Sequence, residues 1–271
     1  MSVTAVQVKE LREKTGVGMM DCKKVLTEAA GDFELAIKLL RERGLSAASK
    51  KADRSTNEGR IFTLLDTAKK KGVIVELGCE TDFVGSNDAF IQMGNDIAKA
   101  LLEQNITTQD ALPTLQVNGK LYTDLLSENV LKLGENLSVK RVEVIATEGQ
   151  LSAYTHMNGK IGVLINFSKS VEDELGRDIA MHAAATSPQY LNQTAVPASE
   201  VEAEREIIRT QIRQEGKPET MIEKIAEGKI GKFFKDICLV EQAFVKDQTQ
   251  SIQQILPQGV EITHFVRYAQ V

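Results

Sequence analysis

Apolar residues recur at helical spacing in the first part of the chain. Three segments each place apolar residues three or four positions apart, which puts them on one face of a helix. Thr4 and Asp32 are suited to cap the first and third segments. Gly44 is expected to end the third, because glycine tolerates the left-handed backbone at a helix C-terminus. We therefore predict three helices over residues 1–44, followed by a polar linker over residues 45–59.

Beyond the linker the chain repeats itself. The matching segments are 58–61 with 148–151, 72–75 with 162–165, and 93–98 with 175–180. The first two pairs share an offset of 90 residues and the third has an offset of 82, so the first copy carries eight extra residues before its helix. The extra length falls in or beside residues 81–84. Each copy combines strand-like runs with a segment of helical periodicity.

The repeat predicts the α+β class. Residues 60–147 and 148–271 are each expected to form a three-stranded antiparallel sheet covered by helices. Within the second copy, residues 199–236 alternate in charge and contain few apolar residues, which is typical of a protruding helical hairpin. Ser199 begins this hairpin with the spacing of a capping box.

Composition excludes several classes of protein. The net charge of −5 disfavours non-specific nucleic-acid binding, which depends on phosphate neutralisation by Lys and Arg. Three widely separated cysteines suggest neither a disulfide framework nor a zinc site. No apolar run approaches the roughly 20 residues of a membrane helix, and the N-terminus lacks a signal-peptide pattern. We expect a cytoplasmic protein that binds neither membranes nor nucleic acid.

Sequence motifs of catalysis are missing. The chain has no phosphate-binding loop, nucleophile elbow or His-Glu-x-x-His motif. The histidines His156, His182 and His264 lie far apart and give no metal-ligand spacing. His182 is expected to pack in the core, whereas His156 lies at the end of a hairpin strand and could reach a partner. A binding protein is therefore favoured over an enzyme, with no cofactor and no metal.

Two segments are candidates for partner contact. Residues 81–84 place an aromatic and an acid on a connection, where function concentrates. Alternatively, the apolar residues of this segment enter the core and Asp82 caps the next helix. Met19 and Met20 precede the second predicted helix, and methionine serves both as core filler and at binding surfaces. The two interpretations are equal for Met19, and a core position is favoured for Met20.

At this point the sequence resembles the bacterial elongation factor Ts family. Residues 11–24, LREKTGVGMMDCKK, are similar to the N-terminal signature of the family, and residues 80–84, ETDFV, to its second signature. His156 with residues 162–164, and residues 178–182, match further stretches. The resemblance covers essentially the whole chain.

The resemblance implies a fold and a partner. The family exchanges guanine nucleotide on elongation factor Tu, a GTPase that carries aminoacyl-tRNA. The implied fold is an N-terminal ubiquitin-associated-like domain followed by two sheet-and-helix units with a coiled-coil arm. Some members continue with a helical C-terminal module that also contacts Tu. This sequence stops at Val271, just after its last predicted strand, so weaker binding to Tu is expected.

The resemblance also assigns contact residues. Those that would enter the GTPase domain near its Mg²⁺ are Thr81, Asp82, Phe83 and Val84. Phe83 would fill an apolar pocket, and Asp82 would disturb the groups that hold the ion. Contacts elsewhere on Tu would come from Met19, Met20, Lys23 and His156. The alternative is a ubiquitin-associated-like adaptor without exchange activity, in which Met19 and Met20 bind partners and residues 82–83 are structural.

Overall fold

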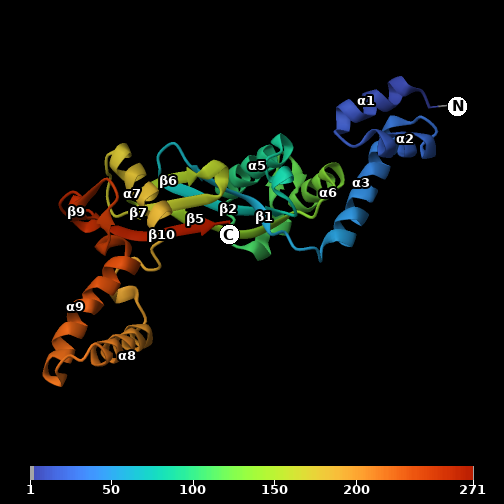
Figure 1. Ribbon diagram of the computed structural model, residues 1–271. Helices are drawn as coiled ribbons and strands as arrows, with labels where there is room; N and C mark the ends of the chain where they lie inside the picture. Colours follow the sequence, from blue (N-terminus) through green and yellow to red (C-terminus); the bar gives the residue numbers. More distant parts are fainter. Residues whose placement is uncertain (1–2, 271) are drawn as a thin grey trace.

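The computed structural model describes residues 3–270, over which helices combine with four small antiparallel sheets (Figure 1). The helices are α1 (Ala5–Thr15), α2 (Met19–Glu28), α3 (Phe33–Lys51), α4 (Asp82–Gly85), α5 (Asp88–Gln104), α6 (Tyr122–Leu133), α7 (Asp173–Thr186), α8 (Ala198–Gln214), α9 (Glu219–Ile237) and α10 (Ile252–Ile255). The strands are β1 (Glu58–Leu65), β2 (Lys71–Cys79), β3 (Gln116–Val117), β4 (Lys120–Leu121), β5 (Ser138–Ala146), β6 (Gln150–His156), β7 (Ile161–Phe167), β8 (Ala243–Phe244), β9 (Asp247–Ser251) and β10 (Ile262–Ala269). Mixed helix and sheet agrees with the predicted α+β class.

Helices α1 to α3 surround a small core of their own. The predicted caps are confirmed: Thr4 accepts a hydrogen bond from the third residue of α1, and the Asp32 carboxylate accepts bonds from the backbone of Glu34 and Leu35. The prediction that Gly44 ends the third helix is wrong, because α3 continues to Lys51. A Cβ at residue 44 would lie 2.9 Å from the Ser127 carbonyl oxygen of α6. Gly44 therefore permits close packing of two helices and does not act as a helix cap.

Two three-stranded sheets form the centre of the molecule. Their strand orders are β1-β2-β5 and β6-β7-β10, so equivalent strands take equivalent places. The register repeats as well: Phe62 lies opposite Val75 in the first sheet, and Ser152 lies opposite Ile165 in the second, each 90 residues later. Apolar residues between the sheets join them, among them Ile61, Ile74, Leu164 and Val266. Helices α5 and α7 pack on β1 and β6 respectively.

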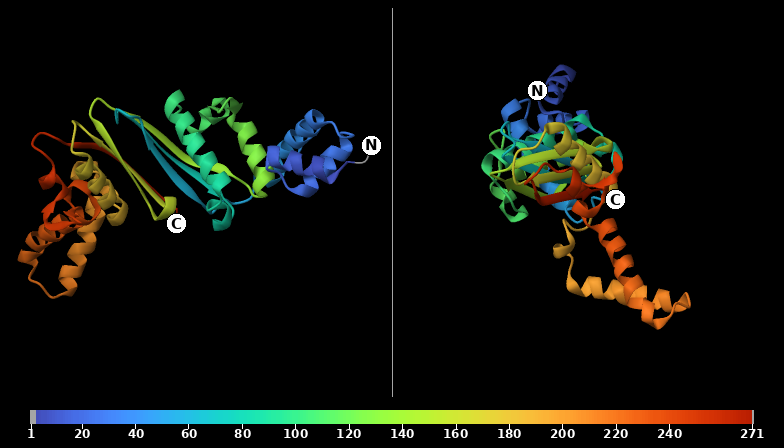
Figure 2. Two further views of the ribbon diagram at one scale, coloured as in Figure 1. Left: turned by 90° about the horizontal axis from the view of Figure 1, so that it is seen from above. Right: turned by 90° about the vertical axis from the view of Figure 1, so that its left-hand side faces the viewer.

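The two copies differ where the sequence repeat changes its offset. In the first copy, the short helix α4 separates β2 from α5. In the second, an irregular segment over residues 168–172 leads from β7 directly to α7. The molecule is elongated, with α1 to α3 at one end and the α8–α9 hairpin near the other (Figure 2).

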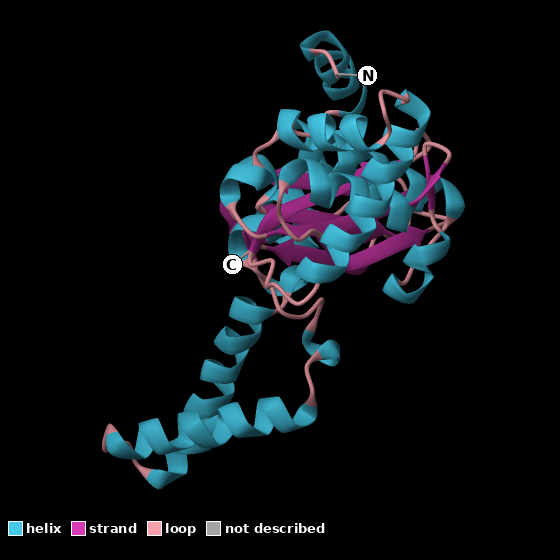
Figure 3. Ribbon diagram, turned by 90° about the vertical axis from the view of Figure 1, so that its right-hand side faces the viewer, coloured by secondary structure: helices cyan, strands magenta, loops and turns pink. Residues whose placement is uncertain are grey.

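Helices α8 and α9 form an arm that stands away from the sheets (Figure 3). Apolar residues hold its two helices together: Ile208, Ile212, Ile222, Ala226 and Ile230. The predicted capping box at Ser199 is wrong, because α8 begins one residue earlier, after Pro197, without a side-chain cap.

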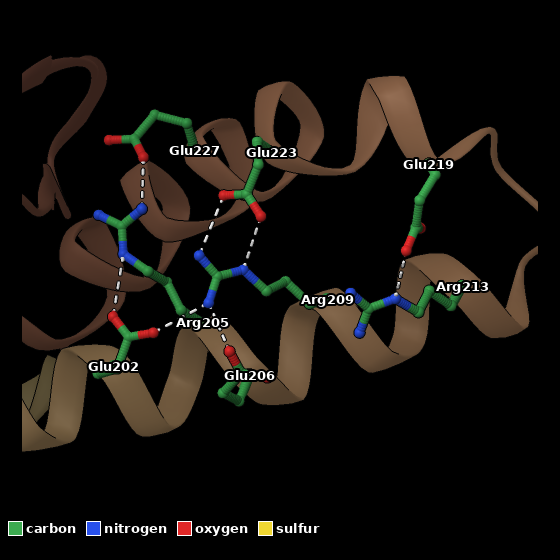
Figure 4. Close-up of polar contacts among 8 residues, drawn as sticks. All are labelled: Glu202, Arg205, Glu206, Arg209, Arg213, Glu219, Glu223 and Glu227. Carbon is green, nitrogen blue, oxygen red and sulfur yellow. Dashed lines mark hydrogen bonds and ion pairs between the residues drawn. The ribbon is translucent and has the colours of Figure 1, made fainter.

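Ion pairs cover the same helix interface (Figure 4). Arg209 binds Glu202 and Glu206 of its own helix and Glu223 of the opposite one. The hydrogen bonds to Glu223 raise the pKa of Arg209, and those from Arg209 lower the pKa of Glu223. The arm therefore combines a thin apolar seam with a charged surface.

Candidate docking site

Helix α4 presents an aromatic side chain to solvent. It has four residues, Asp82–Gly85, and Thr81 caps it by accepting a hydrogen bond from the Val84 amide. Phe83 is 84% exposed, whereas Val84 is half-buried and packs against the core of the first sheet. Two parts of the alternative interpretation, in which this segment is structural, are thereby wrong. Phe83 does not enter the core, and Asp82 does not cap the following helix, since Asn87 caps α5.

The N-terminal end of this turn is tied to the segment that follows α6. The Glu135 carboxylate accepts hydrogen bonds from the backbone amides of Glu80 and Thr81, at 3.0 Å each, and from the Thr81 hydroxyl at 2.6 Å. In return, the Glu80 carboxylate accepts a bond of 2.7 Å from the Asn136 amide. Residues 80–81 and residues 135–136 therefore bind each other, since each pair supplies a carboxylate that accepts hydrogen bonds from the other pair.

The C-terminal end of the turn is tied to β1. The Arg60 side chain donates a hydrogen bond from Nε to the Gly85 carbonyl. Gly85 is buried and lies against Cys79, whose thiol donates to the Thr81 carbonyl. Burial raises the pKa of Cys79 to about 12, so this thiol is a neutral packing group and not a nucleophile.

The bend that follows His156 lies against Arg60, the residue that also binds the turn. The bend after β6, residues 157–159, contacts β1, and a Cβ at Gly159 would lie 3.3 Å from Arg60. His156 is exposed, and its ring stacks on Tyr154, which places its hydroxyl 2.9 Å from Nδ1. Met157 is 66% exposed in the left-handed backbone region. The Arg60 side chain thus binds the end of α4 and lies near the bend that follows His156.

The remaining predicted contact residues belong to α2, at the far end of α3. Met19 is 43% and Met20 is 65% exposed, and Lys23 is exposed one turn further along α2. The expectation that Met20 fills the core is wrong. Cys22, Val25 and Leu26 occupy the buried face of α2, whereas Met20 points to the opposite side.

The other histidines have structural partners. His182 is fully buried, as predicted. Its Nδ1 accepts a bond from the Val245 amide, so Nε2 carries the proton and donates to Gln242. His264 bridges the two sheets through Glu143, at 2.7 Å. Within residues 3–270, no three His, Cys, Asp or Glu side chains are placed to hold a metal ion together.

Sequence reasoning did not find Glu135, Arg60 or Met157. Glu135 lies more than 50 residues from the turn that it binds, and only a glycine just before it marks the end of a helix. Met157 could have been suspected, since it is an apolar residue beside the Asn158-Gly159 turn signal.

Comparison with known families matches most of the chain. The model of the family described as "Elongation factor TS" matches residues 80–270. The match begins at residues 80–85, the docking turn, and includes strand β5 of the first sheet, the whole second sheet and the arm. Thr81–Val84 and His156 lie inside the matched region, whereas Met19, Met20 and Lys23 precede it. None of the helices in the described part of the chain is both long and apolar enough to span a membrane. Because the match extends over more than half of its length, the chain belongs to the elongation factor Ts family.

Proposed function

We propose that this protein is a guanine-nucleotide exchange factor that speeds GDP release from elongation factor Tu. Membership of the family implies a role in translation elongation and an interaction with elongation factor Tu. The proposal adds the mechanism: α4 enters the GTPase domain, Phe83 fills an apolar pocket there, and Asp82 disturbs the groups that hold Mg²⁺.

The exposure of Phe83 carries this proposal. A large aromatic side chain that is 84% exposed forfeits the free energy of burial in the free protein. The same side chain becomes favourable when a partner covers it. Its position at the tip of a short helix that is tied at both ends gives it reach without disturbing the sheet beneath.

The energetics require several contacts. Exchange demands that the factor and GDP each weaken the binding of the other, because linkage is reciprocal. A thousandfold weakening corresponds to about 4 kcal/mol, and burying one aromatic supplies about 1.5–3 kcal/mol. Mg²⁺ bridges nucleotide phosphates and protein oxygens, so displacing it removes a second large contribution. Asp82 is exposed beside Phe83 and would compete for the groups around the ion.

Further contacts come from two other places. The bend after His156 lies near Arg60, which also binds the turn, so His156 and this bend would extend the interface. Met19, Met20 and Lys23 form an exposed edge of α2 that would bind the GTPase separately. No covalent step is needed, since the protein has only to favour the nucleotide-free conformation of its partner.

Release of a fluorescent GDP analogue from elongation factor Tu tests the proposal. The wild-type protein should speed release strongly, and Phe83→Ala should reduce that effect by about tenfold to a hundredfold. Asp82→Ala should reduce it as well. Because both side chains are exposed, the variants should fold normally. Ile207→Ala, which removes an exposed apolar side chain from the arm, is the matched control.

The exposure of Met20 favours the second candidate, a ubiquitin-associated-like adaptor. In that case the wild-type protein would leave GDP release unchanged, and binding of a partner would depend on Met19 and Met20 alone. Full activity in both the Phe83 and Asp82 variants would instead leave an exchange factor whose mechanism does not use the turn.

A further inference from the structure

Helix α4 cannot hold its own orientation. A single turn of four residues fixes many backbone angles for few hydrogen bonds, so it is unstable without tertiary contacts. Phe83 makes no contribution to its anchoring, because the side chain is largely exposed. The direction in which Phe83 points is therefore set by the contacts that hold α4: the bond from Arg60 at its C-terminal end, the packing of Val84, and the bonds to the two residues before the helix.

Glu135 holds those two residues. One carboxylate oxygen accepts both the Glu80 and Thr81 amides, and the other accepts the Thr81 hydroxyl. Bonds to an ionised acceptor are roughly twice as strong as neutral ones. Thr81 is also the cap of α4, so the same contact fixes the first turn of the helix.

We infer that Glu135 is a positioning residue for the docking turn, which acts through Thr81 on the orientation of Phe83. This inference rests on the proposed function, because it assigns to Glu135 a share of the exchange activity. Glu135 would not contact the partner. Its effect is to remove the cost of ordering the turn at the moment of binding, which is how preorganisation raises affinity.

The segment around Glu135 is itself firmly held. Gly134 ends α6 in the left-handed conformation, with φ of 81°, and its carbonyl accepts a bond from Lys51 at the end of α3. The Asn136 side chain donates to the backbone carbonyls of Ala52 and Arg54. The turn is therefore tied, through residues 134–136, to the linker that leads to the N-terminal helices.

A tryptophan at the turn makes its motion measurable. The chain contains no tryptophan, so Phe83→Trp introduces a single probe. Time-resolved fluorescence anisotropy of Phe83→Trp then reports local motion of the turn without any partner. In this background, Glu135→Ala should add a fast component of large amplitude. Glu135→Gln should add little, because an amide oxygen still accepts the two backbone bonds.

Release of the GDP analogue, with natural Phe83, provides the second readout. Glu135→Ala should lower the stimulated rate about tenfold, or about 1.4 kcal/mol, and Glu135→Gln should restore most of it. In the Phe83→Ala background, Glu135→Ala should have little further effect, because both changes act through one side chain. Glu128→Ala, on the surface of α6, is the matched control.

The outcomes separate the two proposals. Unchanged anisotropy in Glu135→Ala overturns the positioning role, whatever the exchange rates are. Additive losses in the double variant also overturn it, since Glu135 would then act elsewhere. A wild-type protein that does not stimulate release overturns the proposed function and with it the share assigned to Glu135, even if the anisotropy shows that Glu135 orders the turn.

Discussion

A glycine in each repeat lets a helix approach its sheet closely, and replacing one of them should be costly. Gly94 of α5 faces Phe62 of β1, and Gly176 of α7 faces Ser152 of β6. Phe62 and Ser152 hold equivalent positions in the two copies. A Cβ at residue 94 would lie 2.1 Å from the Phe62 ring. We predict that Gly94→Ala destabilises the protein.

The geometry sets the magnitude. Carbon atoms in contact lie about 3.5–4.0 Å apart, so the ring must retreat by about 1.5 Å. Phe62 is buried and lies against Phe90, which leaves it little freedom to move. Overpacking of this kind costs about 1–3 kcal/mol. Alanine recovers up to about 1 kcal/mol through its better helix propensity, which leaves a net loss of up to about 2 kcal/mol.

Urea unfolding followed by circular dichroism measures this loss. Gly228→Ala is the matched control, because Gly228 also lies inside a helix but no neighbouring atom lies within 4 Å of the place that a Cβ would take there. That variant should gain about 0.5–1 kcal/mol in the arm. In a Phe62→Leu background, Gly94→Ala should cost less, since the smaller side chain leaves room. If Gly94→Ala and Gly228→Ala shift stability in the same direction, close packing does not explain why both copies of the repeat carry a glycine here.

Two further predictions concern buried polar groups. Burial lowers the pKa of His182 in the folded protein below its ordinary 6.5. Between the folded-state and unfolded-state pKa values the unfolded chain binds more protons, so the free energy of unfolding falls there as the pH falls. The urea midpoint of unfolding should therefore decline below about pH 6.5, and it should decline less in His182→Gln. Equal declines in the two proteins would show that His182 is not the cause. Arg141 binds the buried Glu76 carboxylate and lies over the Tyr268 ring. Arg141→Met should cost about 2 kcal/mol in urea unfolding, whereas Lys99→Met, from an exposed pair, should cost far less; equal costs would refute the argument.

Local patterns predicted most of the elements correctly. The repeat offset of 90 residues reappears as an identical register of β1 with β2 and of β6 with β7. A one-residue slip would exchange the side chains that face the helices with those that face the other sheet, so the register is fixed. The errors arose where a tertiary contact changed the meaning of a local signal. Gly44 has the local pattern of a helix end, yet α6 packs against it. Ser199 has the spacing of a capping box, but the helix has already begun at Ala198, which places Ser199 inside its first turn.

Part of the candidate site was also visible in the sequence, and part depended on tertiary packing. The unusual length of the connection after β2 marked residues 81–84, because an insertion in one copy of a repeat is visible in the sequence alone. Which of its residues face solvent was not visible, since Phe83 and Val84 are both apolar neighbours and only packing separates them. The same limitation applies to Met20, where a methionine suits a core and a surface equally.

Glu135 shows why a supporting residue escapes sequence reasoning while the residue that it supports does not. A contact residue carries its chemistry in its own side chain, so an aromatic beside an acid is noticeable without a structure. A positioning residue has meaning only through its partners, and those of Glu135 are two backbone amides and a hydroxyl on another segment. Backbone amides have no sequence signature, because every residue except proline carries one. Members of the family that bind through the docking turn should therefore be compared at two positions. One is the aromatic at its tip, Phe83, and the other is the acceptor that follows α6, Glu135.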